Sequence, residues 1–92
     1  MLLDAVLTLK TRDEAYLLFE DLCTVAELTA MSQRYRVARM LREKQTCQQI
    51  VRKTGSSTAT IARVNRCLNY GTGGYDMVID RREELEEADG AQ

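Results

Sequence analysis

The chain has 92 residues, 45% of them hydrophobic and 29% charged, with a formal net charge of −1, three cysteines, no histidine and no proline. This length predicts a single domain, residues 1–92, and because no apolar run approaches the roughly 18 residues that cross a bilayer, we expect a cytoplasmic protein with no membrane contact. Without histidine the chain lacks the usual general base, and its odd number of widely spaced cysteines suggests neither disulfides nor a zinc site, so we expect no enzyme activity, no catalytic residue, no cofactor and no metal.

Apolar residues recur every three or four positions, which predicts an all-α fold. A threonine followed three residues later by Glu or Gln is the signature of a capping box and marks three helix starts. These are Thr11 with Glu14, Thr24 with Glu27, and Thr46 with Gln49. The first helix should therefore end near Lys10, the second should begin near Arg12, and the third should run to about Glu43. The residues expected in the core stripe of the third helix are Leu28, Met31, Tyr35, Ala38 and Leu41.

Residues 46–69 predict a helix-turn-helix. A two-turn helix is followed by Gly55 at the position where a left-handed backbone is needed, and one of the next two serines caps a second helix. Val51 on the first helix, with Ile61 and Val64 on the second, has the spacing that fixes the crossing angle of such a pair. DNA-reading helix pairs share this pattern, although structural and protein-binding units also use it.

The last predicted element is an acidic C-terminal helix and tail at about residues 75–92. It follows the glycines of residues 71–74, which we interpret as a helix-ending loop and not as a phosphate loop, because no strand precedes them. Its apolar residues are Tyr75, Val78, Ile79 and Leu85.

Positive charge is concentrated in the middle of the chain. Residues 31–70 hold nine Lys or Arg and one acid, whereas residues 1–30 hold six acids and two bases and residues 71–92 hold seven acids and two bases. Because a basic block of this kind attracts a phosphate backbone, we expect double-stranded DNA as the partner. The residues expected to supply nonspecific attraction are Arg34, Arg36, Arg39, Lys44, Arg52 and Lys53.

The second helix of the pair carries the candidate reading surface. Short side chains at its start let a helix approach base edges, and arginines further along can fork onto guanine or phosphate. The residues expected at the DNA are Ser56, Ser57, Thr58, Ala59, Ala62, Arg63 and Arg66, with Arg52 and Lys53 on the first helix.

Residues 55–68 closely resemble the turn and reading helix of the Trp repressor superfamily. Residues 21–28, 32–34 and 69–75 extend the resemblance to its YerC/YecD family. The resemblance implies a six-helix subunit, an intertwined two-fold homodimer and a regulatory role in DNA binding. It also implies that Gln48 and Val51 lie near the DNA backbone, and that Thr58, Ala59, Ala62 and Arg63 face the DNA.

The same resemblance implies an effector pocket, with departures from the family pattern. The residues at its positions are Gln33, Arg34, Arg63, Val64 and Cys67. Val64 stands where the family has a glycine that leaves room for an indole ring, and Gln33 stands where it has an arginine. Because a valine side chain would overpack an indole slot, we predict that tryptophan is not the effector.

Together these features predict a sequence-specific DNA-binding transcriptional regulator, with repression as the expected mode. The alternative is a protein-interaction module that keeps the helix-turn-helix fold without binding an operator, its basic face docking an acidic partner. A third and weaker alternative is an enzyme-like pocket that senses a ligand.

Overall fold

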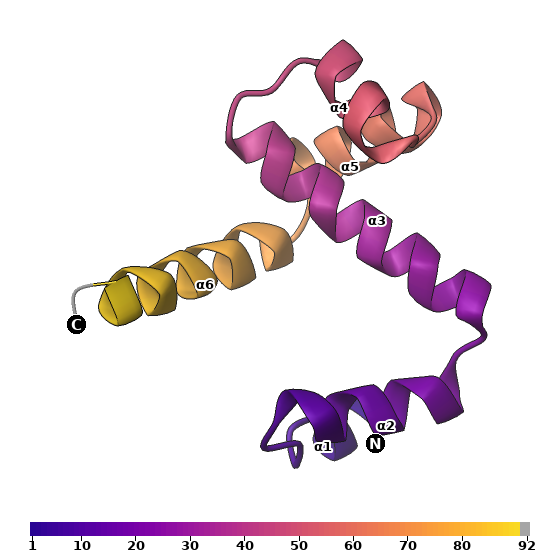
Figure 1. Cartoon of the computed structure of the whole chain (residues 1–92), viewed down its shortest axis with the longest axis vertical. Coiled ribbons are helices and arrows are strands. Elements are labelled where there is room, and N and C mark those ends of the chain that lie inside the picture. The colour runs from indigo at the N-terminus through magenta and orange to yellow at the C-terminus, as the bar shows by residue number, and fades with distance from the viewer. Residues whose placement is uncertain (91–92) are drawn as a thin grey trace. The chain divides into compact units, whose positions relative to one another are not determined.

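The computed structural model describes residues 1–90, with side chains described for residues 1–88, so residues 91–92 of the predicted acidic tail lie outside the described residues. This part of the chain contains six helices and no strand, which confirms the predicted all-α fold (Figure 1). The helices are α1 (Leu2–Val6), α2 (Arg12–Leu22), α3 (Val25–Arg42), α4 (Cys47–Thr54), α5 (Thr58–Tyr70) and α6 (Gly74–Gly90).

The chain divides into two compact units, Met1–Ser32 and Gln33–Gln92, with the division inside α3. The first unit holds α1, α2 and the start of α3, and the second holds the rest of α3 with α4, α5 and α6. The single Trp repressor-like domain expected from the sequence stays a prediction.

Capping residues begin three helices close to the predicted places. At α4, Thr46 Oγ1 accepts from Gln49 N at 3.2 Å and Gln49 Oε1 accepts from Thr46 N at 2.8 Å, which is a complete capping box. Thr24 and Glu27 form the same pair of bonds at the start of α3. At α2 the box is only half formed, because the carboxylate of Glu14 accepts from Lys10 N at 2.8 Å instead of from the cap residue.

Helix α1 ends at Val6, four residues before the predicted end near Lys10. The Thr8 hydroxyl donates to the carbonyl of Ala5 at 2.7 Å, and Thr8 N and Leu9 N donate to carbonyls only three residues back. Bonds of this tighter type close the last turn of a helix. The apolar stripe therefore continues past the helix into a turn.

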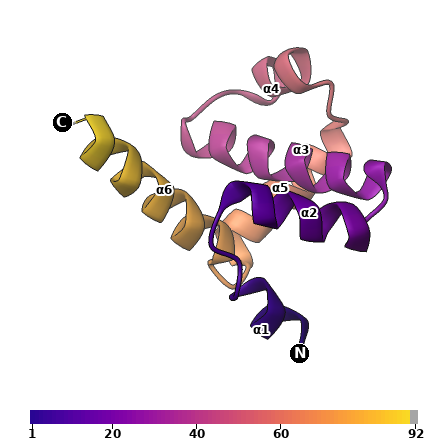
Figure 2. The same ribbon diagram turned by 60° about the horizontal axis from the view of Figure 1, so that its bottom comes forward.

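The core of the second unit is built by three helices and the start of α6. Its buried residues are Val37, Ala38, Met40, Ile50, Ile61, Val64 and Ile79. Helix α5 crosses against α3 in both ribbon views, as this shared core requires (Figures 1 and 2). The predicted packing of Ile61 and Val64 on α5 against the apolar side of α4 is present, with Ile50 fully buried and Val51 half-buried. On α3, however, Val37 and Met40 replace Leu28 and Met31 as the buried positions.

Helix α3 ends in a left-handed residue that is not glycine. Lys44 has a φ of 65°, and the paired bonds from Lys44 N to Leu41 O at 3.0 Å and from Gln45 N to Met40 O at 3.1 Å form a Schellman motif. Glycine is the usual residue at this place because it has no Cβ to clash with the backbone. Lys44 therefore keeps its side chain at a backbone position that strains it.

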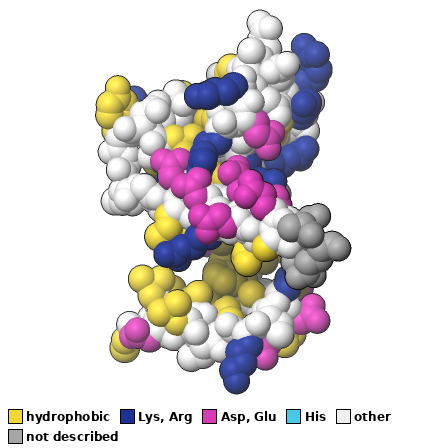
Figure 3. All heavy atoms as spheres, turned by 90° about the vertical axis from the view of Figure 1, so that its left-hand side faces the viewer, with side chains coloured by type: hydrophobic (Ala, Val, Ile, Leu, Met, Phe, Trp, Pro, Cys, Tyr) yellow, Lys and Arg dark blue, Asp and Glu magenta, His cyan; other side chains and the backbone are white. Residues whose placement is uncertain are grey.

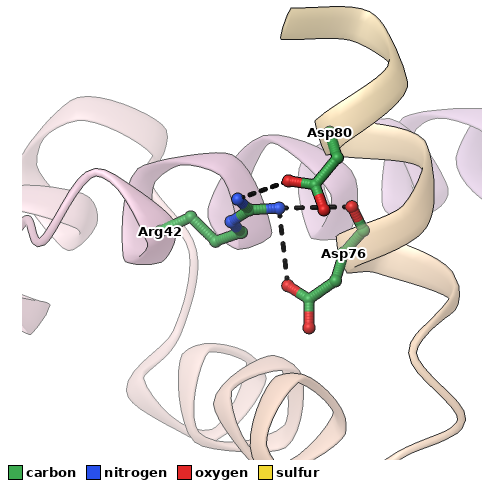
Figure 4. Close-up of polar contacts among 3 residues, drawn as sticks. All are labelled: Arg42, Asp76 and Asp80. Carbon is green, nitrogen blue, oxygen red and sulfur yellow. Dashed lines mark hydrogen bonds and ion pairs between the residues drawn. The ribbon is translucent and has the colours of Figure 1, made fainter. Parts of the chain in front are cut away.

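An ion cluster attaches α6 to the end of α3 (Figure 4). Arg42 Nη2 lies 2.6 Å from Asp80 Oδ1, and Arg42 Nη1 lies 3.5 Å from Asp76 Oδ1 and donates to the Asp76 carbonyl at 3.2 Å. The hydrogen bond to Asp80 raises the pKa of the Arg42 guanidinium above its usual value. One cation of the basic block is thus neutralised by acids far along the sequence.

The first unit has no buried side chain of its own. Figure 3 shows hydrophobic side chains on the surface of α1 and α2, and acidic side chains gathered along α6. Large apolar residues of this unit with half or more of their surface exposed are Met1, Leu2, Leu3, Leu7, Tyr16, Leu17 and Val25. Within residues 1–90, no helix is long and apolar enough to cross a membrane.

Candidate nucleic-acid interface

The candidate interface is the outer surface of α4 and α5, two helices joined by a short turn. Gly55 ends α4 with a φ of 73° and donates its amide to Val51 O at 2.8 Å, so the left-handed turn residue predicted from the sequence is present. Ser57 then caps α5, because its hydroxyl accepts from Thr60 N at 3.1 Å. This turn fixes where the first residues of α5 reach the surface.

The amino-terminal half of α5 presents short side chains and arginines to solvent. Exposed residues of the predicted reading surface are Ser57, Thr58, Ala59, Ala62, Arg63 and Arg66 on α5 and its cap, with Gln48, Arg52 and Lys53 on α4. Lys53 Nζ donates to Gln45 Oε1 at 3.1 Å. Among the described side chains, none of the four cations in this set makes an ion pair.

Ser56 is the exception among the predicted DNA-facing residues. It is only 4% exposed, and its Oγ has no hydrogen-bond partner in the described part of the chain. The side chain therefore does not lie at the surface, in contrast to the outward orientation expected from the sequence. The reason is the turn itself, in which Ser57, one residue later, takes the capping position.

The structure places the residues of the predicted effector pocket in different surroundings. Val64 is 1% exposed and packs in the core, Arg63 is exposed on α5, and Arg34 is half-buried on α3. Gln33 Nε2 donates to the carbonyl of Thr54 at 2.8 Å, a bond that joins α3 to the last residue of α4. This bond, which sequence reasoning missed, satisfies one of the carbonyls that a helix end leaves without a partner.

Cys67 alone of that set lines an apolar cavity of about 550 Å³ in the second unit. The cavity is formed at the end of α5, the glycine loop and the start of α6. Its lining residues are Tyr35, Cys67, Gly71, Thr72, Gly73, Gly74, Tyr75 and Val78. The only signal for this cavity in the sequence is the run of glycines, where small residues leave space. Within residues 1–88, no three Cys, Asp or Glu side chains gather as a metal site would require.

Comparisons with known proteins agree with this arrangement of helices. The family model described as Trp repressor protein matches residues 1–83. The chain is 52% identical over 85 residues to the uncharacterized protein YerC of Bacillus subtilis. The matched residues make up 92% of this chain and 82% of YerC. A solved TrpR like protein from Eubacterium eligens is 57% identical, with a TM-score of 0.87 over 89% of this chain and 84% of its own. A candidate Trp repressor from Staphylococcus aureus is 48% identical, with a TM-score of 0.87 over 89% of this chain and 82% of its own. This chain therefore belongs to the Trp repressor family.

Proposed function

We propose that this protein is a sequence-specific DNA-binding transcriptional regulator that reads a two-fold operator as a homodimer, through the outer surface of α4 and α5. The observation that carries the proposal is the set of exposed cations on this surface, Arg52, Lys53, Arg63 and Arg66, which no described acid neutralises. Free cations can displace the counterions condensed on DNA, whereas paired ones must first lose their acidic partners.

The start of α5 is suited to enter a major groove. Thr58, Ala59 and Ala62 are exposed and short, so the helix backbone can approach base edges closely. Arg63 and Arg66 follow on the same exposed side, where each can fork onto a guanine or a phosphate. Membership of the Trp repressor family supports this use of the pair, and it favours repression as the sign of regulation.

A second copy of the chain would cover the apolar surface of the first unit. Residues 1–32 contain no buried side chain, and Leu3, Leu7 and Val25 are at least 74% exposed. Exposed apolar surface of this extent is typical of an interface, and homodimers usually have two-fold symmetry. Sedimentation equilibrium should therefore show a dimer, and a folded monomer at micromolar concentration would contradict the proposal.

The test of DNA binding is selection of duplexes from a random pool, followed by affinity measurements over a range of salt concentrations. Affinity for every duplex should fall steeply with salt. Arg63→Ala should lose about 1 to 3 kcal/mol on the selected operator, if Arg63 forks onto a base, and less on unrelated duplexes. Lys53→Ala should weaken all duplexes alike.

The matched control is Arg81→Ala, which removes a cation from α6 outside the proposed surface and should leave operator selectivity intact. If the wild-type protein retains no duplex at low salt, the surface does not bind DNA and the protein-interaction module takes its place. A reporter gene placed behind the selected operator would test repression, since expression should fall when the protein is supplied.

A further inference from the structure

A second cavity in the same unit is lined mainly by polar groups and has no role in the function proposed above. It has a volume of about 460 Å³ and lies where the end of α3, the later turns of α5 and the start of α6 meet. Its lining residues are Leu41, Arg42, Lys44, Asn65, Leu68, Asn69 and Asp76. A cavity that gathers cations and amides is suited to an anionic group.

Lys44 is the free cation of this cavity. Its side chain is exposed and, within the part of the chain that the structure describes, makes neither an ion pair nor a hydrogen bond. Its φ of 65° is one at which glycine would be unstrained. The fold thus keeps a lysine in the lining of the cavity in spite of backbone strain, and strain of this kind is often found at functional positions.

Asn65 and Asn69 provide amide donors from one side of α5. They are four residues apart, so their side chains are neighbours on the helix surface. Both are exposed, and neither makes a side-chain hydrogen bond among residues 1–88. Asn65 follows Thr58 by seven residues and Asn69 follows Ala62 by seven, which is about two helical turns. The two amides therefore continue the proposed DNA-facing stripe toward the end of α5.

The carboxylate in the cavity wall is paired with a cation. Asp76 lies 3.5 Å from Arg42 Nη1, and the other terminal nitrogen of Arg42 holds Asp80 at 2.6 Å (Figure 4). The guanidinium is thus taken up by the two carboxylates, and the three groups together keep a net charge of −1. Lys44 and the two amides are left as the groups that can receive an anion.

We propose that Lys44, Asn65 and Asn69 form a phosphate site, which anchors a backbone phosphate of the bound DNA beyond the reading half of α5. The choice of a DNA phosphate rests on the proposed function, because the site continues the same helical stripe. Lys44 supplies the charge, and the carboxamide nitrogens of the two asparagines donate to phosphate oxygens. A free phosphate would be held by the same groups.

The test compares Lys44→Met with wild type in a salt titration of duplex binding. Methionine keeps an unbranched side chain and the same backbone strain, so folding should not change. Loss of one phosphate contact should reduce the slope of log affinity against log salt by about 0.9. Asn65→Ala and Asn69→Ala should weaken all duplexes with the slope unchanged, since neither removes a charge. Arg81→Met is the control for charge alone and should leave the slope as it is.

A second arm titrates wild type and Lys44→Met with inorganic phosphate and follows the side-chain amide signals of Asn65 and Asn69 by NMR. A lower slope in Lys44→Met supports the site with DNA as the source. An unchanged slope with saturable shifts in wild type, absent from Lys44→Met, supports a phosphate site for a free ligand and overturns the DNA anchor. An unchanged slope with no saturable shift overturns the site altogether.

The two proposals fail separately. If wild type binds duplexes in a salt-dependent way but Lys44→Met behaves like it in both arms, only the phosphate site is wrong. If wild type binds no duplex, the DNA-binding function fails and the phosphate titration alone decides whether the site exists.

Discussion

Adjacent serines in the turn between α4 and α5 should respond to alanine in opposite directions. The Ser56 hydroxyl is buried without a partner, and burying such a group destabilises a fold by about 1 to 3 kcal/mol, so Ser56→Ala should stabilise the protein by about 1 kcal/mol. The Ser57 hydroxyl accepts from Thr60 N at 3.1 Å as the cap of α5, and losing such a cap typically costs about 1 kcal/mol. The two variants should therefore differ by about 2 kcal/mol although each loses a single oxygen atom.

Thermal unfolding of the two variants at one protein concentration is the measurement, because the midpoint would depend on concentration if the proposed dimer forms. For a chain of this size about 1 kcal/mol corresponds to roughly 4 to 8 °C. Ser56→Ala should melt higher than wild type by about that amount, and Ser57→Ala lower by a similar amount. If Ser56→Ala is destabilised as much as Ser57→Ala, its hydroxyl has a partner and the reasoning is wrong. If Ser56→Ala instead keeps its stability and loses affinity for DNA, Ser56 reaches the DNA after all.

Three further outcomes are expected. Lys44→Gly should have a free energy of unfolding about 0.5 to 1 kcal/mol higher than Lys44→Ala, and so a higher melting midpoint. Glycine removes a left-handed backbone strain of about 1 to 2 kcal/mol, but part of this gain is lost because glycine makes the unfolded chain freer. Equal midpoints would show that the strain is absent. The hydrogen bond from the Thr24 backbone amide, and after it the Thr24 hydroxyl, lowers the pKa of Glu27 below its ordinary value. The stability that ionised Glu27 contributes is therefore present above the ordinary pKa and is lost as the pH falls through the lowered one. Glu27→Gln should show a smaller loss of midpoint in acid than wild type, and an identical acid profile would contradict this. L-Tryptophan at millimolar concentration should give no saturable heat in calorimetry, because Val64 fills its position in the core and Gln33 is bonded to Thr54; saturable binding in the micromolar range would contradict it.

The helix starts could be predicted from the sequence because capping is local. A threonine and its partner three residues later determine each other's bonds, and this holds at Thr24 and Thr46. The packing between α4 and α5 could be predicted for a similar reason, since Gly55, Ile61 and Val64 lie within ten residues of one another.

Features that join distant parts of the sequence could not be predicted in this way. Arg42 pairs with Asp76 and Asp80, more than thirty residues later, and not with the adjacent Glu43. The burial of Val37 and Met40 depends on which side of α3 the later helices cover. The place of Ser56 depends on a choice between two adjacent serines for the cap, and only the turn geometry makes that choice.

The bond between Gln33 and Thr54 has a consequence for how the protein is controlled. It joins α3 to α4 through atoms of the chain alone. Without it, the carbonyl of Thr54 at the end of α4 would need another hydrogen-bond donor. A ligand can shift a conformational equilibrium only as far as the competent state is not yet populated. On the proposed function, we predict that the state in which the chain itself holds α4 is populated without a ligand, so that an effector has little left to shift. Operator occupancy would then follow the concentration of the protein, so that synthesis and degradation of the chain set the level of regulation.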